Sequence, residues 1–197
     1  MHRRFGYFLL STLLSLLDSL PHDPRPVVLD LGCGPGLLLD YLHATRREAD
    51  VDYQGVDRSP AMIAAARARW PAHAFSVRDV VSQPLPDGSV DVVVMNGVLT
   101  EKVDLDHDAM ASLARTLIRA AFASARVGIA FNVMSRHVDR QRADLFHWAH
   151  DDLAAFLTAE ISRHYTFRAD YGLYEYAVFV HRHPQRPSPL EGEWWQS

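Results

Sequence analysis

The sequence has one cysteine, Cys33, among its 197 residues. A single thiol excludes a disulfide framework and a zinc site built from four cysteines. The chain also lacks an excess of positive charge, because 24 acidic residues outnumber 20 basic ones and the net charge is −4. Lysine is almost absent: Lys102 is the one lysine, and no mechanism follows from it. Proteins that grip a phosphate backbone normally present a basic face, so the composition argues against nucleic acid as a partner.

A hydrophobic run long enough to cross a membrane is also missing. The apolar stretch over residues 5–17 is shorter than the ~18 residues that a spanning helix needs. Together with the basic residues 1–4 it superficially resembles a signal peptide, but Asp18 follows directly and no small-x-small cleavage site precedes Pro21. We therefore expect no membrane partner and a cytoplasmic location.

Residues 1–20 have the pattern of one amphipathic helix. The polar face of this helix lacks the lysines and arginines that a membrane-surface helix would present. We therefore expect the helix to pack on the domain, over the functional site. Its apolar residues recur at spacings of three and four, namely Phe5, Phe8, Leu9, Leu13, Leu16, Leu17 and Leu20.

After a proline-rich linker at residues 21–26, strand-like apolar runs alternate with helical patterns. Such alternation is typical of an α/β, Rossmann-like fold, in which a mostly parallel sheet has helices on both faces. Too few residues join the last two strands for a crossover helix, so the last strand is expected to be antiparallel. We expect one domain over residues 21–182 and an irregular tail over 183–197, where Trp194 and Trp195 could dock. The expected strands are 27–31, 51–56, 74–77, 90–95, 126–134, 164–170 and 175–181, and the expected helices are 37–45, 60–70, 151–161 and a long helix that Asp106 or Asp108 caps and that ends near residue 124.

The first expected strand leads into a glycine-rich turn that contains Gly32, Gly34 and Gly36. Glycines in a strand-to-helix turn allow positive backbone dihedral angles and let a ligand approach the main chain closely. A dinucleotide site would have the spacing G-x-G-x-x-G, and Asp30 before the turn would repel a pyrophosphate. Pro35 also removes an N–H group that could donate to phosphate. The turn therefore favours a ligand that carries an ammonium group near Asp30.

Two further acids follow the next strands. Asp57 ends the second strand, at the distance expected of a carboxylate that accepts hydrogen bonds from a ribose diol. Asp79 follows the third strand, where it could accept from an adenine amino group, and Met62 and Ile63 could cover the faces of the adenine. These requirements together describe a zwitterionic amino acid joined to adenosine without phosphates. That molecule is S-adenosylmethionine.

Residues 30–36, 55–63, 77–79 and 91–97 form four motifs in order along the chain. They are similar to the motifs of the class I S-adenosylmethionine-dependent methyltransferases, and the resemblance covers nearly the whole chain. It implies a seven-stranded sheet with six parallel strands and an antiparallel last strand. It also implies S-adenosylmethionine as the cofactor and says little about the acceptor. The residues expected to bind the cofactor are Arg4, Asp30, Gly32, Gly34, Gly36, Asp57, Arg58, Met62, Asp79 and Val80, with Asn96 and Gly97 through their backbone.

Several of these residues also have a simpler structural interpretation. The glycines, Asp30 and Asp57 could be turn residues and helix caps, although their joint placement favours cofactor binding. Asp79 could cap the turn after its strand, and Cys33 is expected to fill space within the glycine turn. Arg4 either binds the methionine carboxylate or is a solvated arginine at a helix end.

The sequence defines the binding site of the methyl acceptor less well than that of the cofactor. Its expected walls are the N-terminal helix, the polar connection over residues 135–150, which contains two candidate histidines, and the last hairpin. The hairpin segment 170–176 combines three tyrosines with the carboxylate of Glu175, a set suited to an aromatic cage around a cation. The alternative is a hairpin whose tyrosines are half buried against helices. The catalytic candidates are His137, His147, Glu175 and Tyr176.

The main functional hypothesis is methyl transfer to an oxygen or nitrogen of a small molecule. Such a displacement depends on aligning the reacting atoms and excluding water, and it needs a base only where the acceptor must lose a proton. No metal is expected, although the carboxylates of Asp104, Asp106 and Asp108 leave a metal site as an alternative. Alternatives are cyclisation of the cofactor to azetidine-2-carboxylate and methylthioadenosine, and a binding module without turnover. Nucleic-acid methylation is disfavoured because no Asn/Asp-Pro-Pro-aromatic motif follows Met95.

Overall fold

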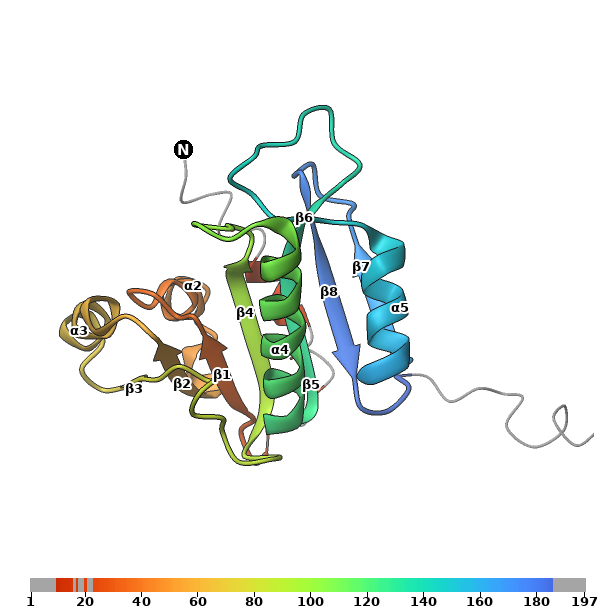
Figure 1. Ribbon diagram of the computed structural model, residues 1–197. Helices are drawn as coiled ribbons and strands as arrows, with labels where there is room; N and C mark the ends of the chain where they lie inside the picture. The colour runs from red at the N-terminus through yellow and green to blue at the C-terminus, as the bar shows by residue number, and fades with distance from the viewer. Residues whose placement is uncertain (1–9, 16, 18–19, 21–22, 186–197) are drawn as a thin grey trace, which may run out of the picture.

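The computed structural model describes residues 10–15, 17, 20 and 23–185. Strands and helices alternate along this part of the chain as the apolar pattern predicts, and Figure 1 shows their arrangement. The strands are β1 (Val27–Leu31), β2 (Asp52–Asp57), β3 (Ala74–Val77), β4 (Val90–Leu99), β5 (Ala125–Ser135), β6 (His147–Trp148), β7 (Tyr165–Arg168) and β8 (Glu175–His181). The helices are α2 (Leu37–Ala44), the short 3-10 helix η2 (Glu48–Asp50), α3 (Pro60–Arg69), α4 (His107–Ser124) and α5 (His150–Glu160).

The strands form one sheet in the order β3-β2-β1-β4-β5-β8-β7. β1 to β5 pair in parallel, whereas β8 is antiparallel to both of its neighbours, β5 and β7. The predicted α/β fold and antiparallel last strand are therefore confirmed. The predicted number of seven strands is one too few, because β6 pairs in parallel with Met134 and Ser135 of β5. Residues 135–150 were expected to be irregular, and a strand of two residues has no periodicity that a sequence could reveal.

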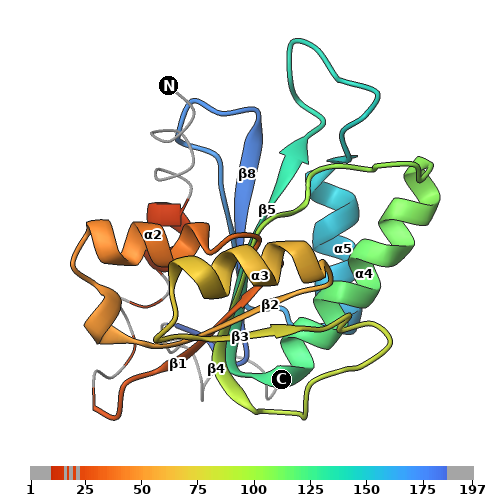
Figure 2. The same ribbon diagram turned by 90° about the vertical axis from the view of Figure 1, so that its left-hand side faces the viewer.

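Two apolar cores cover the two faces of the sheet. β4 contributes to both because side chains alternate along a strand, so Val93 and Met95 lie in one core and Val92 and Val94 in the other. The first core packs against α4 and α5, and the second packs against α2 and α3. Figure 2 shows the two helix pairs on opposite sides of the sheet. The prediction of helices on both faces is confirmed.

Two of the helices begin at side chains that cap them. Ser59 precedes α3, and its hydroxyl accepts a hydrogen bond from the backbone N–H of Met62. Asp106 caps α4, because its Oδ1 accepts from the N–H of Ala109 at 2.8 Å. Of the two acids expected to cap this helix, the structure therefore selects Asp106.

The N-terminal segment packs on the second core. Residues 10–14 are helical, and this core contains leucines of the segment together with Leu38 of α2 and Tyr171. No helix in the described ranges is both long enough and apolar enough to span a bilayer. Arg4 with the expected helix before residue 10, and the tail with Trp194 and Trp195, lie outside the described residues. The buried leucines of the segment are Leu10, Leu13, Leu14 and Leu17.

Candidate functional site

The residues of the four motifs gather at one edge of the sheet. In parallel strands the carboxyl ends meet at the same edge, and ligands of open α/β sheets bind there. The glycine turn follows β1, Asp57 ends β2, Asp79 follows β3, and Asn96 lies near the end of β4. Since β1 pairs with both β2 and β4, these residues surround the end of β1. We call this side of the sheet the carboxyl edge.

The glycine turn has the backbone geometry that the sequence predicts. Gly32, Gly34 and Gly36 have φ angles of 76°, 53° and 88°, a region that side chains with a Cβ rarely adopt. A Cβ on Gly32 would lie 2.4 Å from Cγ2 of Val98, so even a methyl group does not fit there. A Cβ on Gly34 would meet no atom within 4 Å, which leaves the backbone at this position open to a ligand.

Asp57 is hydrogen-bonded to the glycine turn. Its Oδ2 accepts from the N–H of Gly34 at 2.9 Å, and its Oδ1 accepts from the N–H of Ser59 at 2.8 Å. A carboxylate offers about four acceptor positions, so each oxygen can still accept a hydroxyl group. Asp57 is half-buried and therefore reachable. It holds the turn next to the end of β2 and keeps acceptor capacity for a diol.

Asp30 lies deeper than the sequence suggests. Its side chain is buried, and its Oδ2 accepts a hydrogen bond of 2.9 Å from the hydroxyl of Tyr53. Burial raises the pKa of Asp30 to about 7, although the hydrogen bond from Tyr53 opposes the shift. A cation close to Asp30 would favour its ionised form. Contact with an ammonium group is consistent with this chemistry and stays a prediction.

Cys33 is buried within the turn. Burial, and then the charges of Asp30 and Asp57, raise the pKa of its thiol to about 12. The thiol is therefore protonated near neutral pH, and nucleophilic chemistry needs the thiolate. These properties agree with the interpretation of Cys33 as a residue that fills space.

The expected adenine side of the site is only partly assembled. Asp79 is exposed, and its Oδ1 and Oδ2 accept from Val81 N–H and the Ser82 hydroxyl at 3.0 and 3.1 Å. These are the bonds of a residue that caps a turn, which is the alternative considered for Asp79; its role toward adenine stays a prediction. The other side chains predicted for the cofactor differ in exposure. Arg58 and Met62 are exposed. Val80 lies in the first core, and Ile63 is buried in the second core instead of covering a ligand.

A hydrogen-bond chain joins three strands at the carboxyl edge. The N–H of Gly97 donates to Asn132 Oδ1 at 2.8 Å, and Asn132 Nδ2 donates to Glu175 Oε2 at 2.6 Å. Burial raises the pKa of Glu175, and the bond from Asn132 partly offsets this effect. The side-chain oxygen of Asn96 is buried and has no hydrogen-bond partner among the described residues. No pattern in the sequence indicates that Asn132 links Gly97 to Glu175.

The structure corrects the prediction for Tyr176. This side chain is 0 % exposed, its hydroxyl donates to the backbone carbonyl of Trp148 at 3.2 Å, and its ring stacks on His150 with centroids 4.0 Å apart. Tyr176 belongs to the first core, whereas Tyr171 belongs to the second. Tyr174 is exposed and donates to Asp139. The three tyrosines therefore do not form an aromatic cage: Tyr176 points into the core from β8, whereas Tyr171 and Tyr174 lie in the connection before β8 and have different surroundings.

The two candidate histidines also differ from each other. His147 is buried, with Nδ1 2.6 Å from the carbonyl oxygen of Ser135 and Nε2 3.3 Å from the N–H of Arg142. Both ring nitrogens are thus engaged by the backbone, so the prediction of His147 as a base is wrong and its role is to hold the connection in place. His137 is exposed, and its ring lies 5.7 Å from that of His150. Its part in catalysis stays a prediction.

Comparison with known proteins gives a consistent result. Residues 28–120 match the family described as "Methyltransferase domain". A Mycobacterium tuberculosis protein known as "Putative methyltransferase Rv1506c" is 34% identical over 156 residues, which cover 78% of this chain and 91% of that protein. Trans-aconitate 2-methyltransferase of Methylobacterium radiotolerans is 38% identical over 84 residues, or 43% of this chain. The match spans 31% of that enzyme's length.

Solved structures with the same fold include two methyltransferases. Magnesium protoporphyrin IX methyltransferase from Synechocystis PCC 6803, with bound S-adenosylhomocysteine, has a TM-score of 0.63 at 15% identity, covering 92% of this chain and 83% of that one. The 1,6-didemethyltoxoflavin-N1-methyltransferase of Burkholderia thailandensis has a TM-score of 0.58 at 22% identity, covering 89% and 76%. At these identities the similarity shows a shared fold.

Proposed function

The chain belongs to the class I S-adenosylmethionine-dependent methyltransferases, and from this premise we propose that it methylates an oxygen or nitrogen of a small molecule. The observation that carries the proposal is the glycine turn bonded to Asp57 at the carboxyl edge. When bound, S-adenosylmethionine supplies a methyl group activated by a sulfonium. The protein's own task is then to position the two reactants and to exclude water.

The residues present fit this cofactor. The backbone at Gly34 and Gly97 is open, since a Cβ at either position would meet no atom within 4 Å. The buried oxygen of Asn96 lacks a partner among the described residues and is available to a donor. In the proposal Asp57 accepts from the ribose hydroxyls, Asp30 faces the ammonium group, and the peptide groups near Gly97 line the pocket.

Glu175 is the side chain that we assign to proton transfer. It is the first residue of β8, at the carboxyl edge, and Asn132 fixes one of its oxygens. Burial raises its pKa, which brings a carboxylate closer to the range in which it can act as a base. The residue is needed only if the acceptor must lose a proton, and a neutral amine could react without it.

The structure does not favour cyclisation of the cofactor. That alternative places aromatic residues around a desolvated amine, and the tyrosines of the last hairpin lie apart from one another, with Tyr176 in the core. Incubation of the pure protein with S-adenosylmethionine alone separates the possibilities. Methylthioadenosine as a product would favour cyclisation, and the proposal expects none.

Thermal denaturation with S-adenosylhomocysteine tests the proposal directly. At a hundred times its dissociation constant the ligand should stabilise the fold by ~2.7 kcal/mol. ATP and NAD at the same concentration are the matched controls, because the acidic turn should reject phosphates. Stabilisation by NAD and none by S-adenosylhomocysteine would refute the proposed cofactor site.

A further inference from the structure

A cavity lies at the carboxyl edge, on the side where the methyl acceptor is expected to bind. Its volume is about 230 Å³, which is smaller than the ~300–1,000 Å³ of a typical ligand pocket, so it suits one end of a small molecule. Its lining residues come from the connection between β4 and α4, from the start of α4, from the segment 136–146 and from β6. Figure 1 shows that this segment projects as a loop beyond the sheet. The lining side chains are Lys102, His107, Arg136, Gln141, Arg142, Ala143, Leu145 and His147. We call it the basic pocket.

Backbone hydrogen bonds hold the two walls of the basic pocket together. The N–H of Phe146 donates to the carbonyl of Thr100 at 2.8 Å, and the N–H of Lys102 donates to the carbonyl of Asp144 at 3.0 Å. Glu101 and Leu145 form an antiparallel bridge. A pocket whose walls are paired in this way has a fixed shape, unlike a gap under an unattached loop.

β6 explains why the segment 136–146 closes over the end of β4. β8 occupies one side of β5, so β6 must pair with the other side, next to β4. Leu99 of β4 pairs with Val133, and His147 of β6 pairs with Met134, so β6 continues the line of β4. The side chain of His147 then ties the backbone at Ser135, where the segment begins, to the backbone at Arg142 within it.

The charge of the basic pocket contrasts with that of the whole chain. Arg142 is paired with Asp144, with Nε–Oδ1 at 3.0 Å and Nη2–Oδ2 at 2.5 Å. Lys102 and Arg136 have no acidic partner within 4 Å among the described residues. Glu101 is the other acid close to Arg142. Two cations without an ion pair therefore line a cavity of a protein with a net charge of −4.

We propose that the basic pocket binds an anionic group of the acceptor, a carboxylate or a phosphate. Guanidinium and ammonium groups form charge-assisted hydrogen bonds with both kinds of anion. Lys102 follows Gly97 closely in the chain, and Gly97 and Arg136 lie at the exits of β4 and β5, so the bound group would lie beside the proposed cofactor crevice. This inference rests on the proposed function and narrows its substrate class to small organic acids.

Isothermal titration with tricarballylate and with glycerol phosphate, in the presence of S-adenosylhomocysteine, tests the proposal. We expect saturable binding of at least one of the two acids, and the one that binds identifies the preferred anion. Tricarballylamide, the uncharged analogue, should not bind. The double variant Lys102→Gln/Arg136→Gln should weaken binding of the acid more than tenfold.

Arg140→Gln is the matched control variant, because Arg140 is exposed in the same segment and does not line the pocket. It should retain the wild-type affinity for the acid. An equal loss in Arg140→Gln, binding of the amide, or no binding of either acid to the wild type would overturn the proposal.

Affinity for S-adenosylhomocysteine separates the two proposals. The double variant should bind S-adenosylhomocysteine like the wild type, which also shows that it is folded. If the wild type binds neither acid but binds S-adenosylhomocysteine, the proposal that the basic pocket binds an anion is refuted and the proposed function is not. If the wild type does not bind S-adenosylhomocysteine, the proposed function fails.

Discussion

At the amino edge of the sheet, where the parallel strands begin, Asp91 and Glu48 are bonded to basic side chains. At the carboxyl edge Asp57 bonds to the main chain, and Lys102 and Arg136 have no ion pair among the described residues. Asp91, near the start of β4, accepts from the N–H of Val27 and from Arg126 Nε, both at 2.8 Å. It thereby joins the starts of β1, β4 and β5. Asp57 occupies the corresponding place at the carboxyl edge, but it holds backbone N–H groups alone.

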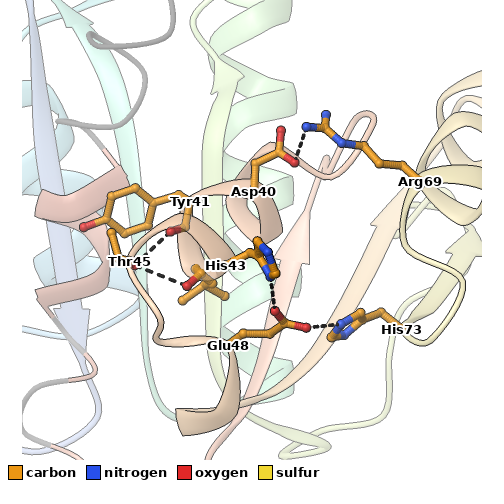
Figure 3. Close-up of polar contacts among 8 residues, drawn as sticks. Asp40, Tyr41, His43, Thr45, Glu48, Arg69 and His73 are labelled. Carbon is orange, nitrogen blue, oxygen red and sulfur yellow. Dashed lines mark hydrogen bonds and ion pairs between the residues drawn. The ribbon is translucent and has the colours of Figure 1, made fainter.

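Figure 3 shows a second example from the side where β2 and β3 begin. The carboxylate of Glu48 lies 2.7 Å from His43 Nδ1 and 2.8 Å from His73 Nε2, and these bonds lower the pKa of Glu48. Arg182 likewise donates to the carbonyls of Phe122 and Ala125 beside a cavity of about 720 Å³. Polar groups at this edge satisfy one another, so we infer that they serve stability, and the carboxyl edge retains capacity for ligands.

The largest effect should come from Gly32→Ala. The new Cβ would lie 2.4 Å from Val98 on a backbone with φ 76°, so we expect a loss of about 2–4 kcal/mol in the free energy of unfolding, measured with urea. Gly88→Ala is the control at the amino edge, with φ 60° and its nearest atom, in Arg126, at 3.6 Å. Equal losses in the two variants would contradict the close contact with Val98.

Asp30→Asn should make the protein more stable at high pH. The folded state holds the proton of Asp30 more tightly than the unfolded chain does, because burial raises its pKa from 3.8 to about 7. The wild type therefore loses stability through this group as pH rises from 4 to 7. The variant avoids the loss and should gain up to about 4 kcal/mol at pH 8 and little at pH 4. Denaturation at both values checks this; a less stable variant at pH 8 would show that the carboxylate stabilises the fold.

Asp57→Ala should act on ligand affinity. Loss of charge-assisted bonds to the ribose should weaken binding of S-adenosylhomocysteine by about 1.5–3 kcal/mol, measured by titration calorimetry. Asp52→Ala is the control, because Asp52 is an exposed residue at the other end of the same strand. If Asp57→Ala binds as tightly as the control, Asp57 does not hold the ribose.

In contrast to Asp57→Ala, Asp91→Ala should lower the stability of the fold and leave ligand affinity unchanged, and its effect should be the smallest of the four. Removal of its bonds to Val27 and Arg126 should cost about 1–2 kcal/mol of stability and leave S-adenosylhomocysteine affinity unchanged. Burial alone would raise the pKa of Asp91, but these two partners outweigh it and lower the pKa, so its stabilisation is present at neutral pH and lost as pH falls below about 4. Asp87→Ala, at an exposed position in the preceding turn, is the control. Weaker ligand binding in Asp91→Ala would contradict the inference that the amino edge serves stability and the carboxyl edge serves ligand binding.

The sequence predicts the features that depend on local pattern. Short apolar runs indicate strands, so β1 and β3 match their expected bounds. The glycine turn is visible because its backbone angles favour glycine. The placement of Asp57 follows from the order of the strands. These elements need no knowledge of distant contacts.

The remainder of the site depends on contacts between distant segments. Tyr176 and His147 have residue types suited to catalysis, but partners from β6 and the segment 136–146 bury them or occupy their polar atoms. Asn132 gains its role through Gly97 and Glu175, which lie far from it in the chain. Lys102 suggested no mechanism in the sequence, and it lines the basic pocket only because the later segment returns to β4.

The pairing at β6 has a consequence for how this scaffold could diversify. Both ends of the segment 136–146 are anchored to the sheet by main-chain bonds, which any amino acid except proline can make. Residues between the anchors are therefore free to change without disturbing the strands that carry the cofactor motifs. The segment can therefore be replaced as a unit, and substituting a different sequence between the same two anchors should alter which methyl acceptor the protein prefers.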